Sequence, residues 1–135
     1  MTDSPHEFLN PAHWKRPVGY ANGVAAHGRL IFTGGVVGWN AEQVFESDDF
    51  AEQAGQALHS IVEILALGGA RPEHLVRLTW YVTDKRDYLA SLQNLGRAYK
   101  AAIGRHWPAM ALVQVVALVE DRAKVEIEAT AVVPD

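Results

Sequence analysis

The sequence contains no cysteine among its 135 residues. Without a thiol, the protein has no disulfide, no thiolate zinc site and no cysteine nucleophile. Apolar runs of 18 or more residues are also lacking, and no basic segment followed by an apolar one opens the chain. These absences predict a cytoplasmic protein with no membrane partner.

Basic residues are too few and too scattered to form a nucleic-acid surface. The 12 lysines and arginines are outnumbered by 16 aspartates and glutamates, which gives a formal net charge of −4. Because nucleic-acid binding depends on clustered positive charge, we expect no nucleic-acid partner. The six histidines lack the spacing of a metal site, and no dinucleotide or P-loop motif is present. We therefore expect no metal and no cofactor.

The length and the apolar fraction of 49% suit one domain of modest size. Residues 1–18 include Pro5, Pro11 and Pro17 and predict an irregular N-terminal arm. Arms of this kind often pack across a neighbouring subunit. Residues 19–135 are expected to form the single domain.

Two strand-like stretches, 20–26 and 29–37, follow the arm. His27-Gly28 separates them and predicts a hairpin turn, because glycine readily adopts a positive φ. Three glycines interrupt the second stretch: Gly34, Gly35 and Gly38. They either present backbone N–H groups to an anionic ligand or form a bulge and a tight turn.

The first helix has well-defined start and stop signals. Asp49 is an N-cap candidate, and Glu52 three residues on completes a capping box. Gly68-Gly69 ends the helix. The pattern then predicts a strand and a second helix, over residues 75–83 and 87–103.

The last quarter of the chain has the pattern of two strands. Residues 106–118 and 123–133 alternate with period two and are rich in branched residues. We expect two adjacent strands joined at residues 120–122. On the last strand one face is apolar and suits the core, whereas the other face carries Glu126 and Glu128.

The element order β-β-α-β-α-β-β suits an α+β fold, with a single sheet and two helices on one of its faces. Four apolar residues lie on strands that also need core on the opposite side: Leu78, Trp80, Leu112 and Val116. A sheet that is apolar on both faces must be covered, and in a small domain another subunit supplies the cover. We therefore expect an oligomer.

Six short motifs run in order along nearly the whole chain: Gly19-Tyr20, Thr33-Gly34-Gly35, Gly68-Gly69-Ala70, YVTD at residues 81–84, Pro108-Ala109, and EIEA at residues 126–129. In this order and spacing the chain resembles the Rid/YjgF family, the reactive intermediate deaminases also known as endoribonuclease L-PSP-like proteins. The resemblance implies the chorismate-mutase-like YjgF fold and a homotrimer with a central barrel. It also implies small-molecule clefts between subunits.

The resemblance implies a catalytic role for Glu126, the first glutamate of the EIEA motif, which in the family positions the hydrolytic water. From strand alternation alone, Glu126 and Glu128 share a face that is either catalytic or simply solvated and salt-bridged. Gly34 matches the glycine whose backbone lines the deaminase cleft, and Gly35 follows it as a second substrate-binding candidate.

Four more residues are substrate-binding candidates: Tyr20, Trp39, Met110 and Leu112. Family deaminases carry an arginine at the position of Met110, where it clamps the substrate carboxylate. Met110 and Leu112 either make the cleft apolar or fill the core. Tyr20 either faces the cleft or is half-buried with one hydrogen bond, and Trp39 either stacks on a flat ligand or packs under the glycine loop.

Together these residues predict a small-molecule hydrolase of deaminase type, acting on a reactive imine, enamine or related metabolite in an inter-subunit cleft. Because Met110 replaces the arginine, we do not expect a standard 2-imino acid deaminase. The alternative is a non-catalytic trimer that binds a small molecule in the same cleft. A ribonuclease would need a basic groove that the sequence does not supply.

Overall fold

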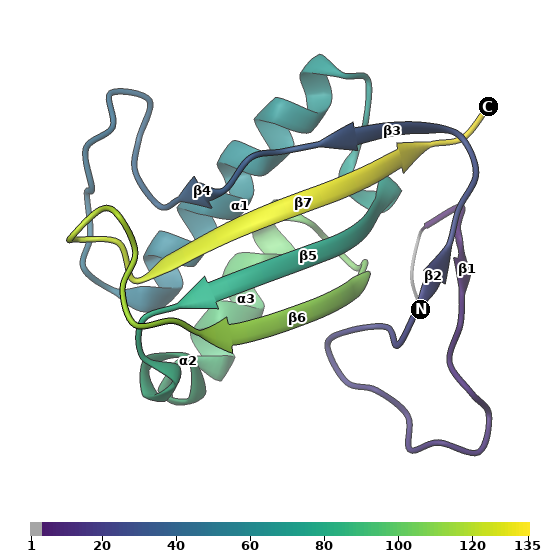
Figure 1. The fold of residues 1–135 in the computed structure, drawn as a ribbon, viewed down its shortest axis with the longest axis horizontal. Helices are drawn as coiled ribbons and strands as arrows, with labels where there is room; N and C mark the ends of the chain where they lie inside the picture. Colours follow the sequence, from purple (N-terminus) through teal and green to yellow (C-terminus); the bar gives the residue numbers. More distant parts are fainter. Residues whose placement is uncertain (1–3) are drawn as a thin grey trace.

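A five-stranded sheet with helices on one face forms the centre of the computed structural model, which describes residues 4–135 (Figure 1). The strand order is β3-β7-β5-β6, and β4 also pairs with β7. The strands are β3 (Arg29–Phe32), β4 (Val36–Val37), β5 (Leu75–Val82), β6 (Ala109–Gln114) and β7 (Val125–Val133). β6 runs parallel to β5, whereas β7 is antiparallel to β3, β4 and β5.

Helices cover one face of this sheet and lie behind it in Figure 1. They are α1 (Phe50–Leu67), α2 (Lys85–Ala90) and α3 (Leu92–Ala102), with a short 3-10 turn, η1 (Pro72–His74), before β5. α1 begins and ends as predicted. The Asp49 side chain accepts a hydrogen bond from the Glu52 backbone N–H at 3.0 Å and caps the start of the helix. At its end the chain turns away at Gly69, which has a φ of 78°. The α+β architecture, with one main sheet and its helices on one face, is confirmed.

The core lies between the sheet and α1. Alternate side chains of β5 and β7 point into it, among them the fully buried Leu78, Val82 and Ile127. They pack with Leu58 and Ile61 of α1, which are also fully buried. Each such side chain contributes about 1.5–3 kcal/mol through burial. The predicted division of β7 into an apolar and a carboxylate face is thereby confirmed.

The uncovered face of the sheet is mixed rather than apolar. Of the four residues on which the expected second apolar face was based, Leu78, Trp80 and Leu112 lie on the helix-covered side. Val116 is fully exposed and lies beyond the end of β6. β3 and β6 give the uncovered face exposed apolar side chains such as Phe32 and Val113. β5 and β7 give it mainly polar and charged ones, because side chains along most of each strand alternate between core and surface, apart from a bulge between Leu75 and Arg77.

The hairpin predicted at His27-Gly28 does not form. β3 pairs with β7, while β2 (Val24–Ala25) pairs with β1 (Glu7–Phe8) as a separate two-stranded ribbon. Gly28 does have a positive φ of 148°. Its role is a close crossing, because a Cβ at this position would lie 2.8 Å from the carbonyl carbon of Val133. The glycine signal was correct, but the partner strand is distant in sequence.

The two last strands are not neighbours in the sheet. β5 lies between them, parallel to β6 and antiparallel to β7. Parallel pairing of β5 with β6 requires a long crossover, which α2 and α3 supply. The link over residues 115–124 then carries the chain past β5, so β6 ends at Gln114 rather than at residue 118.

The second helix differs from its predicted range of 87–103. α2 begins at Lys85 because the Asp84 side chain accepts a hydrogen bond from the Arg86 backbone N–H at 2.9 Å. The helix then breaks at Ser91, whose ψ of 11° is not helical, and α3 continues from Leu92. No helix within residues 4–135 is long and apolar enough to cross a bilayer.

Candidate functional site

A bulge separates β3 from β4. Phe32 pairs with Thr130 and Val36 with Ile127, so three residues (33–35) lie opposite two (128–129). The Thr33 hydroxyl stabilises this bulge. Its Oγ1 accepts from the Ala129 backbone N–H at 3.0 Å and donates to the Gly34 carbonyl at 2.8 Å.

The three glycines of this segment have different surroundings. A Cβ at Gly35 would lie 2.8 Å from the carboxyl carbon of Glu126, whereas one at Gly34 would meet nothing within 4 Å. A Cβ at Gly38 would lie 2.7 Å from the Cα of Gln53 on α1. Gly35 therefore lets the loop pass beneath Glu126, and Gly38 lets β4 approach α1.

Glu126 and Glu128 share the uncovered face, but within residues 4–135 only Glu128 has a hydrogen-bond partner. The Tyr81 hydroxyl donates a hydrogen bond to Glu128 Oε1 at 2.8 Å. This hydrogen bond is the main cause that raises the pKa of Tyr81 above its ordinary value. Glu126 makes no hydrogen bond or ion pair within residues 4–135. It is thus the carboxylate that remains available to a ligand or a water.

Strand alternation places Tyr81 on the uncovered face, yet its partner could not be predicted from sequence. Tyr81 pairs in register with Glu126, but its hydroxyl reaches diagonally to Glu128. Such diagonal contacts depend on the local twist of the strands. The only signal is the position of Tyr81 at the start of the YVTD motif.

A cavity of about 490 Å³ brings together Gly35, Trp39 and Glu126 of the predicted set, and we call it the glycine-loop pocket. Two further carboxylates, Glu63 and Glu120, line it as well. Trp39 also packs on Phe45, with ring centroids 5.6 Å apart. Trp39 therefore packs on Phe45 and forms part of the cavity wall, and its role in stacking on a ligand stays a prediction.

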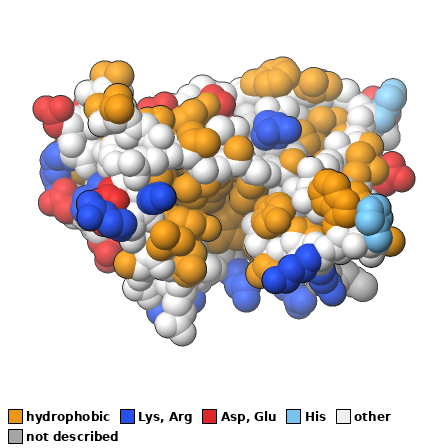
Figure 2. Space-filling model, turned by 60° about the horizontal axis from the view of Figure 1, so that its bottom comes forward, with side chains coloured by type: hydrophobic (Ala, Val, Ile, Leu, Met, Phe, Trp, Pro, Cys, Tyr) orange, Lys and Arg blue, Asp and Glu red, His pale blue; other side chains and the backbone are white. Residues whose placement is uncertain are grey.

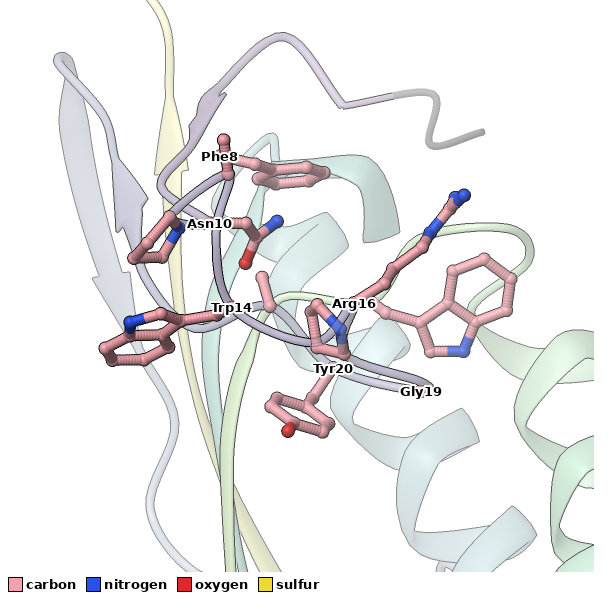
Figure 3. Close-up of a pocket in the computed structure, with 11 residues that line it drawn as sticks. Phe8, Asn10, Trp14, Arg16, Gly19 and Tyr20 are labelled. Carbon is pink, nitrogen blue, oxygen red and sulfur yellow. The ribbon is translucent and has the colours of Figure 1, made fainter.

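Tyr20 lines a different cavity, of about 380 Å³, which we call the arm pocket (Figure 3). Its lining consists of Phe8, Asn10, Pro11, Ala12, Trp14, Arg16, Pro17, Gly19, Tyr20, Ala21 and Trp107. The Ala21 backbone N–H donates to the Pro108 carbonyl at 3.0 Å and joins the arm to the start of β6. The arm pocket therefore lies beside the β6 edge of the sheet.

Met110 and Leu112 point to the helix-covered side of β6. They lie opposite Leu78 and Trp80 of β5 and pack, partly buried, against the main core. Neither lines the glycine-loop pocket or the arm pocket. This placement matches the core-filling alternative for the two residues.

The candidate residues fall into two groups at opposite edges of the sheet. Met110 pairs with Leu78, and Leu78 pairs with Ala129, three residues along β7 from Glu126. With about 4.8 Å between strands and about 3.3 Å per residue, the Cα atoms of Met110 and Glu126 are about 14 Å apart. One chain therefore does not bring them into a single site.

Metal ligands do not gather in the part of the chain that the structure describes. Within residues 4–135, no three histidine, aspartate or glutamate side chains are close enough to hold a metal ion. The buried histidines act instead in packing, a role that the sequence did not reveal. His106 is 1% exposed, and its Nε2 lies 2.7 Å from the Leu75 carbonyl.

Comparison with known proteins agrees with this architecture. A family model described as Endoribonuclease L-PSP matches residues 14–133. A 2-iminobutanoate/2-iminopropanoate deaminase of Escherichia coli (strain K12) is 32% identical over 116 residues, which cover 84% of this chain and 86% of that protein. A crystal structure of a Rid-family protein of unknown function from Yersinia pestis has a TM-score of 0.84 at 29% identity, covering 95% of this chain and 98% of that one. For a YjgF/YER057c/UK114 family member from Mycobacterium tuberculosis, the TM-score is 0.63 at 34% identity, with coverage of 86% and 88%. The chain belongs to the Rid/YjgF family of endoribonuclease L-PSP-like proteins.

Proposed function

We propose that this protein is a cytoplasmic small-molecule hydrolase of deaminase type, which acts on a reactive imine, enamine or related metabolite. The observation that carries the proposal is the state of Glu126. Its carboxylate lies over Gly35 and has no hydrogen-bond or ion-pair partner within residues 4–135, whereas Glu128 is held by Tyr81. The relative named as an imine deaminase supports the same class of chemistry.

In the proposed reaction the Glu126 carboxylate holds and deprotonates a water. The water oxygen adds to the imine carbon while the C=N electron pair moves to nitrogen, which takes the proton that Glu126 removed from the water. The resulting carbinolamine then passes its O–H proton through the Glu126 carboxylate to the amino group, so that the C=O bond forms as the C–N bond breaks and ammonia leaves. Water and imine thus give a carbonyl compound and ammonia, and proton transfer of this kind contributes about 10²–10⁴-fold to rate.

The proposed site is completed by a second subunit. Glu126, Gly35 and Trp39 lie toward the β3–β4 edge, and Tyr20 lies beside the β6 edge. Head-to-tail contact between two unlike edges generates a ring where the rotation closes, and the ring that we propose is the homotrimer that the family resemblance implies. Such contact would also cover exposed apolar side chains on the outer strands, such as Phe32 and Val113. Figure 2 brings the lower side of Figure 1, with the β6 edge, forward and shows hydrophobic side chains around a hollow.

A non-catalytic trimer that binds a small molecule is the second candidate function, and Met110 favours it. The family deaminases hold the substrate carboxylate with an arginine at this position. Met110 supplies no charge and packs against the core. We therefore do not expect turnover of small aliphatic 2-imino acids at the rate of an arginine-bearing deaminase.

The test compares Glu126→Gln with Glu128→Gln on imines and enamines generated in solution, followed by ammonia release. Glu126→Gln keeps the shape and removes the proton acceptor, so turnover should fall about 10²-fold or more. Glu128→Gln should lose much less, because Tyr81 can still donate to the amide oxygen. Equal turnover by Glu126→Gln and the unaltered protein would rule out Glu126 as the catalytic group, and no turnover by the unaltered protein would leave the binding trimer as the function.

Subunit mixing tests whether the site is shared. Chains with Tyr20→Ala and chains with Glu126→Gln are each expected to be impaired when assembled alone. Trimers reassembled from both would contain some clefts with an intact Tyr20 from one chain and an intact Glu126 from its neighbour, so activity should partly return. No recovery in verified mixed trimers would place both residues in a site within one chain.

A further inference from the structure

The arm pocket is unusual in the number of aromatic side chains that surround it. Phe8, Trp14, Tyr20 and Trp107 all line the cavity. Trp14 is 56% exposed and Tyr20 is 45% exposed. The pocket therefore exposes large aromatic surfaces to solvent. Concave sites with apolar walls and a few polar groups are where small ligands bind, and a volume of about 380 Å³ is in their usual range.

Arg16 supplies the only charge among the residues that line this pocket within the described part of the chain. Its guanidinium makes no hydrogen bond and no ion pair within residues 4–135. Figure 3 shows its side chain extending from the arm to the side of the pocket opposite Trp14. The described lining of the pocket therefore offers a cation and aromatic faces, and it contains no carboxylate that would compete for the cation.

Buried neighbours hold two of the aromatic walls in place. Phe8 stacks on the buried His106, with ring centroids 5.8 Å apart and an interplanar angle of 17°. Trp107 stacks on the buried Tyr99 at 6.3 Å and 10°, and the Tyr99 hydroxyl donates to the His106 carbonyl at 2.6 Å. Walls fixed in this way lose little freedom when a ligand binds, which favours affinity.

Hydrogen bonds at its base close the arm into a loop. The Leu9 backbone N–H donates to the Gly23 carbonyl at 2.9 Å, and the Asn10 side chain accepts from the Asn22 N–H at 2.8 Å. Trp14 and Arg16 lie within the loop so closed. Both are thus presented by a tethered segment rather than by a free terminus.

We propose that the arm pocket binds a small aromatic anion, with its ring among the aromatic side chains and its carboxylate on Arg16. A planar guanidinium pairs with a carboxylate through two parallel hydrogen bonds, and aromatic rings favour one another in stacked or edge-on geometry. The inference names a ligand class for the Tyr20 side of the proposed cleft. The binding of such a ligand is independent of the proposed function, and only its use as a substrate rests on that function.

Phenylacetate is a suitable probe because it carries a ring and a carboxylate but no C=N bond, so its binding is independent of turnover. Calorimetry on the full-length protein should show saturable binding. Arg16→Gln should weaken this binding about tenfold or more, since a hydrogen bond to a charged group contributes about 1.5–3 kcal/mol. Lys15→Gln removes the same charge from the adjacent residue, which does not line the pocket, and should leave the affinity within about twofold.

Two neutral or non-aromatic probes complete the test. Phenylacetamide lacks the charge and cyclohexylacetate lacks the aromatic ring, so both should bind more weakly than phenylacetate. The inference is overturned if phenylacetate does not bind, if phenylacetamide binds equally well, or if Lys15→Gln weakens binding as much as Arg16→Gln. Phenylacetate binding without imine turnover would refute the proposed hydrolase and leave this inference standing.

Discussion

The glycine-loop pocket and the arm pocket are opposite in charge. Glu63, Glu120 and Glu126 line the first, and Arg16 lines the second. Each also contains an exposed or half-buried aromatic residue, Trp39 in the first and Trp14 among those in the second. A ligand shared between them across a subunit boundary would meet a proton acceptor at one end and an anion-binding group at the other.

The two pockets also differ in what holds their shape. Close backbone approaches at Gly35 and Gly38 shape the glycine-loop pocket. Stacked side chains and loop hydrogen bonds shape the arm pocket. The first should therefore respond to a single added methyl group, and the second to changes in side-chain packing and protonation.

Among substitutions that test this difference between the two pockets, Gly38→Ala is expected to have the largest effect, which is a loss of stability. The new Cβ would press on the backbone of Gln53, which is 1% exposed. The Gln53 side chain holds three backbone groups, donating to Ser47 O and Arg122 O and accepting from Lys124 N at 2.8–3.0 Å. Overpacking of this kind costs about 1–3 kcal/mol, measurable as a lower urea midpoint.

Gly96→Ala is the matched control for that substitution. Gly96 lies in α3, and a Cβ there would meet nothing within 4 Å. Since alanine favours a helix over glycine by about 1 kcal/mol, this variant should be slightly more stable than the unaltered protein. A Gly38→Ala variant as stable as Gly96→Ala would show that the approach of β4 to α1 does not need glycine.

The next effect is expected from Gly35→Ala, and it concerns activity rather than stability. The methyl group would displace the Glu126 carboxylate, whose flexible side chain can move without unfolding the protein. A catalytic group displaced by about 1 Å can lose up to about 10²-fold in rate, so turnover of any imine substrate should fall at least about tenfold. Gly96→Ala, whose Cβ meets nothing within 4 Å and which does not line the glycine-loop pocket, should leave the rate unchanged. Equal rates for both variants would show that turnover does not depend on the position of the Glu126 carboxylate.

Local signals in the sequence were sufficient for much of the fold. The cap at Asp49 and the stop at Gly68-Gly69 act within one helical turn, so the ends of α1 could be predicted. The alternation of β7 likewise assigned Glu126 to the uncovered face. Both features depend on neighbours in the chain rather than on distant partners.

Features set by distant partners could not be predicted in the same way. β3 pairs with β7 instead of β2, and β5 separates β6 from β7, because strand pairing is decided by segments far apart in sequence. The face of Met110 follows from its register with Leu78. The separation of the candidate site into two edge groups follows in turn from this strand order, which no single motif encodes.

Histidines fix the arm to the body of the protein. His6 Nε2 lies 3.1 Å from the His74 carbonyl and donates to it. His74 Nδ1 in turn accepts the Arg71 backbone N–H at 3.0 Å, which requires a neutral ring. Burial, more than the nearby charges of Arg71 and His6, lowers the pKa of His74 below its ordinary value of 6.5, and only Glu73 opposes the shift.

The smallest expected effect is therefore a pH dependence that His74 adds to the unfolding free energy. Because the folded protein holds His74 neutral, the unfolded chain binds its proton at higher pH, so this stability is present above about pH 6.5 and is lost as pH falls below it. The slope is at most about 1.4 kcal/mol per pH unit. His74→Asn keeps an acceptor near the Nδ1 position but cannot titrate, so urea unfolding between about pH 5 and pH 7 should show a flatter profile. His59→Asn, at an exposed position on α1, is the control, and a profile that flattens as much for it as for His74→Asn would show that burial of His74 does not govern the pH response.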